Sequence, residues 1–271
     1  MNAVLHIKAK EPADKATTDL LLIAGNRYIN YALLNNLTKE IIEFGYYQLQ
    51  NESEWQNVLR ENEVFSGGYS KSIIAFNMAE SMLVPSEMYK SENDLLHFEV
   101  MFGKSSDVII VSDNLVSLHT HNLTAVPISV HAALSGKFNS TDFKNINSVL
   151  LENYTGEKEE TILLDFRTDE FSVIVFKDDI LQLVQIYSYS TPEDVLYYLL
   201  KICRQLNLAQ QEVKVLLSGL IEKDSAVYRE LYKYFIHLEF EVLPAAIKIS
   251  EELEEYPAHY YSTISKLASC V

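Results

Sequence analysis

The chain has 271 residues, 48% of them hydrophobic, and is long enough to bury the cores of two modest domains. It carries 38 acidic and 22 basic residues, a net charge of −16, without the clustered Lys and Arg that nucleic-acid binding requires. Its longest apolar run is the stretch from Val195 to Leu200, far shorter than the roughly 20 residues that span a bilayer.

The first half predicts a three-stranded meander followed by a helix and a further strand. Apolar runs at 20–24, 27–33 and 40–49 are separated by two pairs that suit tight hairpins, Gly25-Asn26 and Asn35-Asn36. Asn51 and Glu54 can cap a helix, which would bury Trp55, Val58 and Leu59. The next strand is expected at 72–76.

The second half predicts the same unit more clearly. Three strands are expected at 161–166, 171–176 and 180–187, separated by a polar turn at 167–170 and by Asp178-Asp179. A helix then begins with Thr191 as its cap and Pro192 at its first position, while Glu193 and Asp194 complement the helix dipole.

The remainder of this half completes the unit. The helix that follows Thr191 has one apolar face and should end near Asn207. A buried strand at 213–217, a turn at Ser218-Gly219, a helix at 226–236 and a strand at 238–242 follow. The two halves therefore contain one pattern twice, offset by about 141 residues, which aligns Ala24 with Asp165.

This repeat predicts two domains, residues 1–153 and 154–271, with the boundary near 154–157. Tyr256-Pro257 can start a last helix, whose apolar stripe contains Tyr260, Tyr261, Ile264, Leu267 and Ala268. We expect this helix to return toward the first domain and dock there. The alternative is an exposed helix that binds a partner.

A duplicated unit of three strands, helix, strand and helix resembles the ribonuclease H-like core. Two such units in tandem resemble the actin-like ATPase superfamily, which implies an α/β fold with mixed five-stranded sheets. Three short segments also resemble an uncharacterised Bacteroidetes family assigned to that fold, which has no established activity. They are Ser81-Met-Leu-Val-Pro85, Ala125-Val-Pro-Ile128 and the tail from Tyr256 through Ser269-Cys270.

The resemblance implies a nucleotide site, but this sequence departs from its pattern. An active member has an Asp and a glycine-rich turn in each first hairpin, so that backbone N–H groups approach the phosphates. Asp165 matches the carboxylate, but Arg167, Thr168 and Asp169 replace the glycines, and Ala24 stands at the equivalent position of the first copy.

The adenosine turn of such a site, normally two adjacent glycines, is Ser218-Gly219 in this sequence. Asp165, Ser218 and Gly219 are therefore the candidate remnants of a nucleotide site. Asp165 could instead only cap a turn, and Gly219 could serve only the backbone geometry of its turn. We expect no catalytic residue, no metal and no resident cofactor, with Mg-ATP as the alternative.

Other constellations give weaker signals. His119 and His121, with Asp113 or His131, could hold a metal, but no third ligand has diagnostic spacing. Asp165, Glu193 and Asp224 could form an acidic triad, which would need a basic path for nucleic acid. The loop 66–70 is glycine-rich, but no helix N-terminus follows it. The acidic run 251–255 is a solvated segment or a docking site for a basic partner.

These observations predict a non-catalytic actin-like scaffold that binds another protein. The alternatives are a nucleotide- or metabolite-binding regulator and an active ATPase or sugar-kinase-like enzyme. No secretory signal opens the chain, and Cys203 and Cys270 are its only cysteines, so we expect a cytoplasmic protein without membrane insertion.

Overall fold

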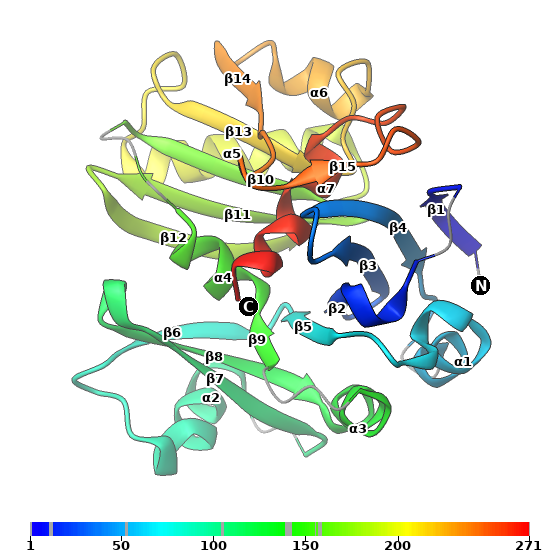
Figure 1. Ribbon diagram of the computed structural model, residues 1–271. Helices are drawn as coiled ribbons and strands as arrows, with labels where there is room; N and C mark the ends of the chain where they lie inside the picture. Colours follow the sequence, from blue (N-terminus) through cyan, green and yellow to red (C-terminus); the bar gives the residue numbers. More distant parts are fainter. Residues whose placement is uncertain are drawn as a thin grey trace. The chain divides into compact units, whose positions relative to one another are not determined.

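The computed structural model describes residues 2–10, 13–51, 54–103, 106–138, 143–154, 156 and 159–270. The chain forms two compact units (Figure 1). The first unit contains residues 1–153, 245–253 and 264–271, and the second contains 154–244 and 254–263. Among the described helices, none has the length and apolar character that crossing a bilayer requires.

The second unit is built on a mixed five-stranded sheet in the order β12-β11-β10-β13-β14 (Figure 1). Adjacent strands in the meander are antiparallel, whereas β10, β13 and β14 run parallel to one another. The strands are β10 (Thr161–Phe166), β11 (Glu170–Lys177), β12 (Ile180–Ser188), β13 (Lys214–Gly219) and β14 (His237–Phe240).

Two helices bury one face of this sheet, α5 (Pro192–Leu206) and α6 (Ala226–Leu231). The predicted start of α5 is correct, since the Thr191 side chain and the Asp194 side chain form a capping box. The helix ends, as expected, at Asn207, which adopts the left-handed conformation. α6 is shorter than predicted because the N–H groups of Tyr234 and Phe235 both bond to the carbonyl of Leu231, closing a turn that leads into β14.

The first unit repeats this strand order. Its sheet has the order β1-β4-β3-β2-β5-β9, in which β4-β3-β2-β5-β9 matches β12-β11-β10-β13-β14. The predicted duplication and the ribonuclease H-like architecture are therefore confirmed. The strands are β1 (Asn2–Lys8), β2 (Thr18–Gly25), β3 (Tyr28–Asn35), β4 (Glu40–Gln48), β5 (Lys71–Asn77), β9 (Phe143–Asn145) and β15 (Lys248–Ile249), and the helices are α1 (Glu54–Glu61), α3 (Ile128–Lys137) and α4 (Ile146–Glu152).

Two features of the first unit differ from the expected five-stranded sheet. β1 pairs antiparallel with β4, and β15 pairs with the start of β4, so this sheet has seven strands. Between β5 and β9 the chain forms a separate three-stranded sheet in the order β6-β8-β7. This insertion contains β6 (Ser81–Pro85), α2 (Asp94–Phe102), β7 (Val108–Leu115) and β8 (Thr120–Pro127).

The C-terminal segment forms α7 (His259–Ser265) and a 3-10 helix at Lys266–Cys270. The predicted apolar stripe is buried, since Tyr261, Ile264 and Leu267 are 0% exposed, which argues against an exposed partner-binding helix. The 3-10 helix packs against α4 and β5 within the first unit. Docking across the domain boundary stays a prediction.

Candidate functional site

The three candidate nucleotide-site residues lie together at the ends of two parallel strands. Asp165 on β10 is in register with Ser218 on β13, and both are buried. Gly219 follows with φ of +76°, and a Cβ at this position would lie 2.1 Å from the carbonyl oxygen of Phe166. The site therefore requires glycine at this turn because of the close approach of the two strands.

Both carboxylate oxygens of Asp165 accept hydrogen bonds from the same unit. Oδ1 accepts from the hydroxyl of Ser218 at 3.1 Å and from the hydroxyl of Thr263 at 2.9 Å. Oδ2 accepts from Nη2 of Arg167, and both members of this ion pair are buried. The negative charge of the carboxylate is thus paired with the charge of Arg167, and both of its oxygens are hydrogen-bonded without any ligand.

Arg167, which stands where the resemblance implies a glycine, pairs with Asp165. Its Nη1 donates to the carbonyl of Asp165 at 3.2 Å and to the hydroxyl of Ser172 at 3.0 Å. The side chain therefore points inward against Asp165. It occupies the end of β10, where a glycine turn would leave room for a phosphate group. The spacing of two residues could have indicated this pairing, because residues i and i+2 of an extended chain share a face.

The equivalence of Ala24 and Asp165 is wrong by one residue. Ala24 pairs with Ile29 across the first hairpin, as Phe166 pairs with Phe171 across the second. Ala24 therefore corresponds to Phe166, and Ile23 corresponds to Asp165. A slip of one residue moves a side chain to the other face of a sheet. The first copy still has no carboxylate at this position.

Helix α7 holds the loop after β13, where the adenosine turn was expected. Nε2 of His259 donates to the carbonyl of Ile221 at 2.6 Å, and the ring stacks on Phe240 at 4.2 Å. The hydroxyl of Tyr260 donates to Glu222 at 2.8 Å. Burial lowers the pKa of His259 and raises the pKa of Tyr260. Sequence reasoning missed these contacts, since they join segments far apart in the chain.

The other predicted constellations do not assemble. Among the residues that the structure describes, no group of three or more His, Cys, Asp or Glu could hold a metal ion. His119 adopts a left-handed conformation, and His121 stacks on Tyr89 at 3.6 Å. Glu193 and Asp224 are exposed, whereas Asp165 is buried. The acidic triad is therefore not formed.

The glycine-rich loop 66–70 is closed by a lysine of the same unit. Nζ of Lys15 donates to the hydroxyl of Ser66 at 2.8 Å and to the carbonyl of Gly67 at 3.0 Å. β5 follows the loop directly, so no helix N-terminus is available for phosphate. The loop has a structural explanation.

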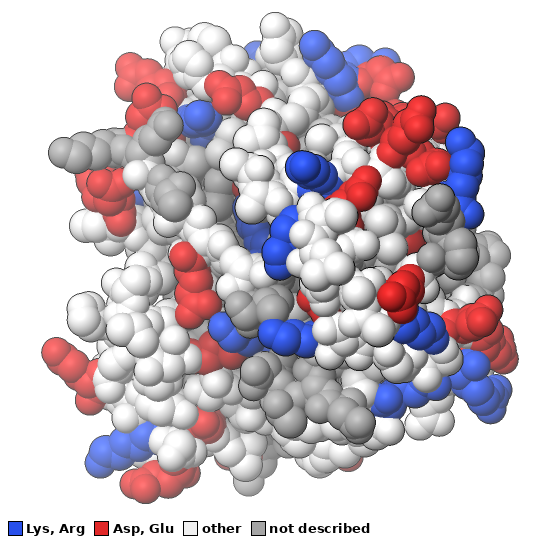
Figure 2. Space-filling model, viewed as in Figure 1, with Lys and Arg blue, Asp and Glu red and all other residues white. Residues whose placement is uncertain are grey.

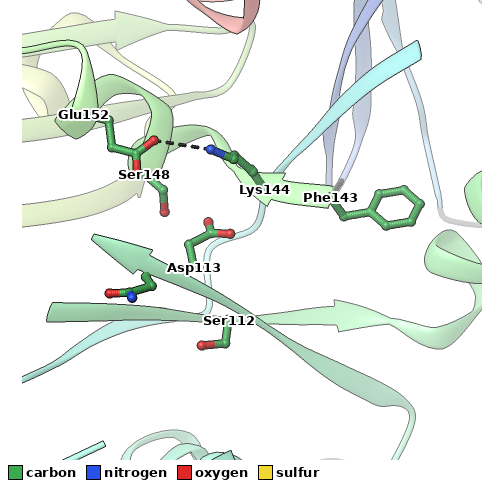
Figure 3. A pocket seen from close by; sticks show the side chains of 7 residues that line it. Ser112, Asp113, Phe143, Lys144, Ser148 and Glu152 are labelled. Atoms are coloured by element: carbon green, nitrogen blue, oxygen red, sulfur yellow. Dashed lines mark hydrogen bonds and ion pairs between the residues drawn. The ribbon is translucent and has the colours of Figure 1, made fainter. Parts of the chain in front are cut away.

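A second candidate is a hollow of about 280 Å³ within the first unit, beside β7, β9 and α4 (Figure 3). Its charged side chains are Asp113, Lys144 and Glu152, of which the last two form an ion pair of 3.4 Å. Asp113 accepts a hydrogen bond from the backbone N–H of Asn145 at 2.6 Å, and burial raises the pKa of its carboxyl group. These charges are satisfied within the chain, so the hollow has no clear ligand chemistry.

The sequence matches the family described as a protein of unknown function (DUF3822) over residues 8–238. The chain belongs to this family. No curated protein matches the sequence.

Solved structures give the fold. The chain is similar to a Bacteroides thetaiotaomicron protein with an actin-like ATPase fold and unknown function, at 16% identity and a TM-score of 0.75, covering 95% of this chain and 99% of that one. It is also similar to the PilM–PilN type IV pilus biogenesis complex, at 11% identity and a TM-score of 0.60, covering 96% and 99%. A third is the ethanolamine utilization protein EutJ from Carboxydothermus hydrogenoformans, at 8% identity and a TM-score of 0.51, covering 97% and 91%. This chain therefore has the actin-like ATPase fold, and its Bacteroidetes origin stays a prediction.

Proposed function

We propose that this chain is a non-catalytic scaffold of actin-like fold, cytoplasmic, which binds another protein. The observation that carries the proposal is the carboxylate of Asp165, which is buried and bonded to Arg167, Ser218 and Thr263. A carboxylate that organises a metal must present its oxygens to the ion. Here both oxygens accept hydrogen bonds from side chains of the protein, so these residues stabilise the fold and do not bind a metal.

Opening this site for a nucleotide would be costly. Arg167 would have to leave Asp165, and breaking a buried ion pair by removing one partner typically costs about 3–5 kcal/mol. The phosphates would also need backbone N–H groups, but Arg167, Thr168 and Asp169 carry side chains in the turn that glycines would form. The first copy contributes Ile23 where a second carboxylate would be needed.

A protein partner suits the remaining observations. Figure 2 shows acidic and basic side chains interspersed among the described residues of the visible face. Nucleic-acid binding would instead need clustered Lys and Arg. One structure of similar fold is a complex of two proteins, PilM and PilN. That likeness supports the proposal only as an analogy of fold.

Thermal unfolding with and without Mg-ATP tests the proposal. A ligand bound only by the folded state stabilises it by about 2.7 kcal/mol at 100 times its dissociation constant. We expect no rise in melting temperature at millimolar Mg-ATP and no phosphate release above background. The same measurements are made on the variant Asp165→Asn. Its melting temperature with Mg-ATP is compared with that of the same variant without Mg-ATP, because the substitution itself changes stability. Metal-dependent turnover that this substitution abolishes would overturn the proposal in favour of an active enzyme.

A further inference from the structure

Strand β12 is the first strand of the five-stranded sheet and therefore forms one of its two edges (Figure 1). Among the described residues it pairs with β11 and with no other strand. Alternate N–H and C=O groups of an edge strand point away from its neighbour and can pair with another chain. Exposed side chains occur along its whole length, at Ile180, Gln182, Gln185 and Ser188.

The first unit shows how this fold fills the equivalent edge. β4 has the place in its sheet that β12 has in the second sheet, and each strand has nine residues. The outer side of β4 is covered by β1, which pairs antiparallel with it, and by β15. The chain supplies no described strand for β12, so the second copy lacks what the first copy has.

Strand β12 has little of the usual protection of an edge strand beyond one irregularity near its start. Proteins protect such edges with charged side chains, proline or distortion of the strand. Residues 180–188 contain no charged residue and no proline. A single register shift, opposite Val175 and Phe176, lies near the start of β12, and the pairing with β11 is regular from Leu183 to Ser188. The edge is therefore suited to accept a strand.

Acidic residues at both ends of β12 indicate the charge of the strand that would pair with it. Asp178 and Asp179 are exposed directly before the strand, and Glu193 is exposed just after it. Asp169 lies at the same end as Glu193, since its carbonyl accepts the N–H of Tyr189 at 3.0 Å. An antiparallel second copy would bring acidic end against acidic end, which is unfavourable. A strand with basic ends is complementary.

We infer that β12 binds an extended segment of a partner protein, in which alternate apolar residues are flanked by Lys or Arg at both ends. The segment adds a strand to the sheet through main-chain hydrogen bonds, as β1 does on β4. This inference rests on the proposed scaffold function and names the surface and the chemistry of its partner.

Two measurements on the full-length protein test the inference. In the free protein, amide hydrogen exchange should be fast at alternate residues of β12 and slow at the residues that donate to β11. The probe is the peptide Lys-Lys-Thr-Val-Thr-Val-Thr-Val-Lys-Lys, which should slow exchange at the fast residues. Two N-methylated versions of the peptide provide a comparison. In one the methyl groups replace the N–H hydrogens that face β12, and in the other they replace those that face away. The second version keeps the main-chain donors that pair with β12, so it should bind at least about tenfold more tightly.

Charge variants provide the control. Asp178→Asn with Asp179→Asn should weaken peptide binding roughly two- to fivefold at low salt, since exposed ion pairs contribute little each. Asn tolerates the positive φ of both residues, so the turn is kept. The matched double variant, Glu254→Gln with Glu255→Gln, removes two exposed acids elsewhere and should leave binding unchanged.

Three results would overturn the inference. They are slow exchange along the whole of β12 in the free protein, no binding of the peptide at 1 mM (about −4 kcal/mol), and equal affinity of the two methylated peptides. A concentration-dependent dimer with β12 protected would assign the edge to a second copy instead. None of these outcomes changes the result of the Mg-ATP experiment. The non-catalytic scaffold proposal is therefore tested independently of the binding site on β12.

Discussion

Thr263 donates a hydrogen bond of 2.9 Å to the carboxylate of Asp165, a residue 98 positions earlier in the chain. The Thr263 hydroxyl also lies 3.3 Å from that of Ser218. One threonine of α7 therefore completes the hydrogen bonding of a buried carboxylate on β10. This relationship makes Asp165 and Ser218, two of the predicted nucleotide-site residues, part of the internal structure of the second unit.

Replacing Thr263 by Val should lower the free energy of unfolding by about 1–3 kcal/mol. Val has nearly the shape of Thr but leaves Asp165 with one donor fewer in a buried site. Urea denaturation measures the change. Thr263→Ser keeps the hydroxyl and should recover most of the stability. Equal losses in both variants would show that packing, and not the hydrogen bond, matters at this position.

Replacing Arg167 by Met should destabilise the second unit by about 3–5 kcal/mol, because it leaves the carboxylate of Asp165 buried without its cation. Denaturant unfolding followed by circular dichroism measures this effect. The exposed residue Lys233, which pairs with Glu230, gives the matched control Lys233→Met. We expect no measurable change there, because water screens an exposed ion pair. A neutral result for Arg167→Met would contradict the structural role of the pair.

Two glycine substitutions should have effects of opposite sign. Gly219→Ala places a Cβ 2.1 Å from the carbonyl of Phe166 at a residue with φ of +76°. It should destabilise the protein by at least about 1–3 kcal/mol. Gly136 lies in α3 with open space around its Cβ position, so Gly136→Ala should stabilise by about 0.5–1 kcal/mol. Melting temperatures that move in the same direction would contradict this account.

Stability should decrease when the pH falls below about 6.5, the ordinary pKa of histidine. Burial lowers the pKa of His259 in the folded protein, so the unfolded chain binds a proton first. The stability that neutral His259 provides is complete above pH 6.5 and is lost as the pH falls toward the folded pKa. His259→Gln keeps a donor for the carbonyl of Ile221 and should show a shallower pH dependence. His131, whose pKa burial also lowers, should leave part of the slope in the variant.

Truncation after Glu255 should lower the melting temperature, because it removes α7 and the 3-10 helix that follows. Ile264 and Leu267 are 0% exposed, and burying each contributes about 1.5–3 kcal/mol. Truncation after Ser265 keeps Thr263 and Ile264 and should be less damaging. Calorimetry of both truncated proteins and of the full chain measures the difference. An unchanged melting point after the longer truncation would contradict the structural role of the tail.

Local patterns were sufficient to predict the second copy. Apolar and β-branched runs separated by short polar turns predicted the three strands of residues 161–187. The start of α5 is defined by four adjacent residues, Thr191 to Asp194. The repeated order of elements supported the resemblance to the ribonuclease H-like core, and that resemblance implied the arrangement of the strands in each sheet. The resemblance to actin-like ATPases singled out Asp165, Ser218 and Gly219, and the structure brings Asp165 into register with Ser218. Their role as remnants of a nucleotide site stays a prediction.

Only the tertiary structure decided the contacts between segments that are far apart in the chain. Residues 2–8 pair with β4, and residues 248–249 pair with the same strand, although no local pattern connects them. Thr263 reaches Asp165, and the hairpin register replaces Ala24 by Ile23 as its counterpart. The physical reason is that capping and alternation act within a few residues, whereas register and long-range pairing depend on which buried faces and backbone groups must satisfy one another.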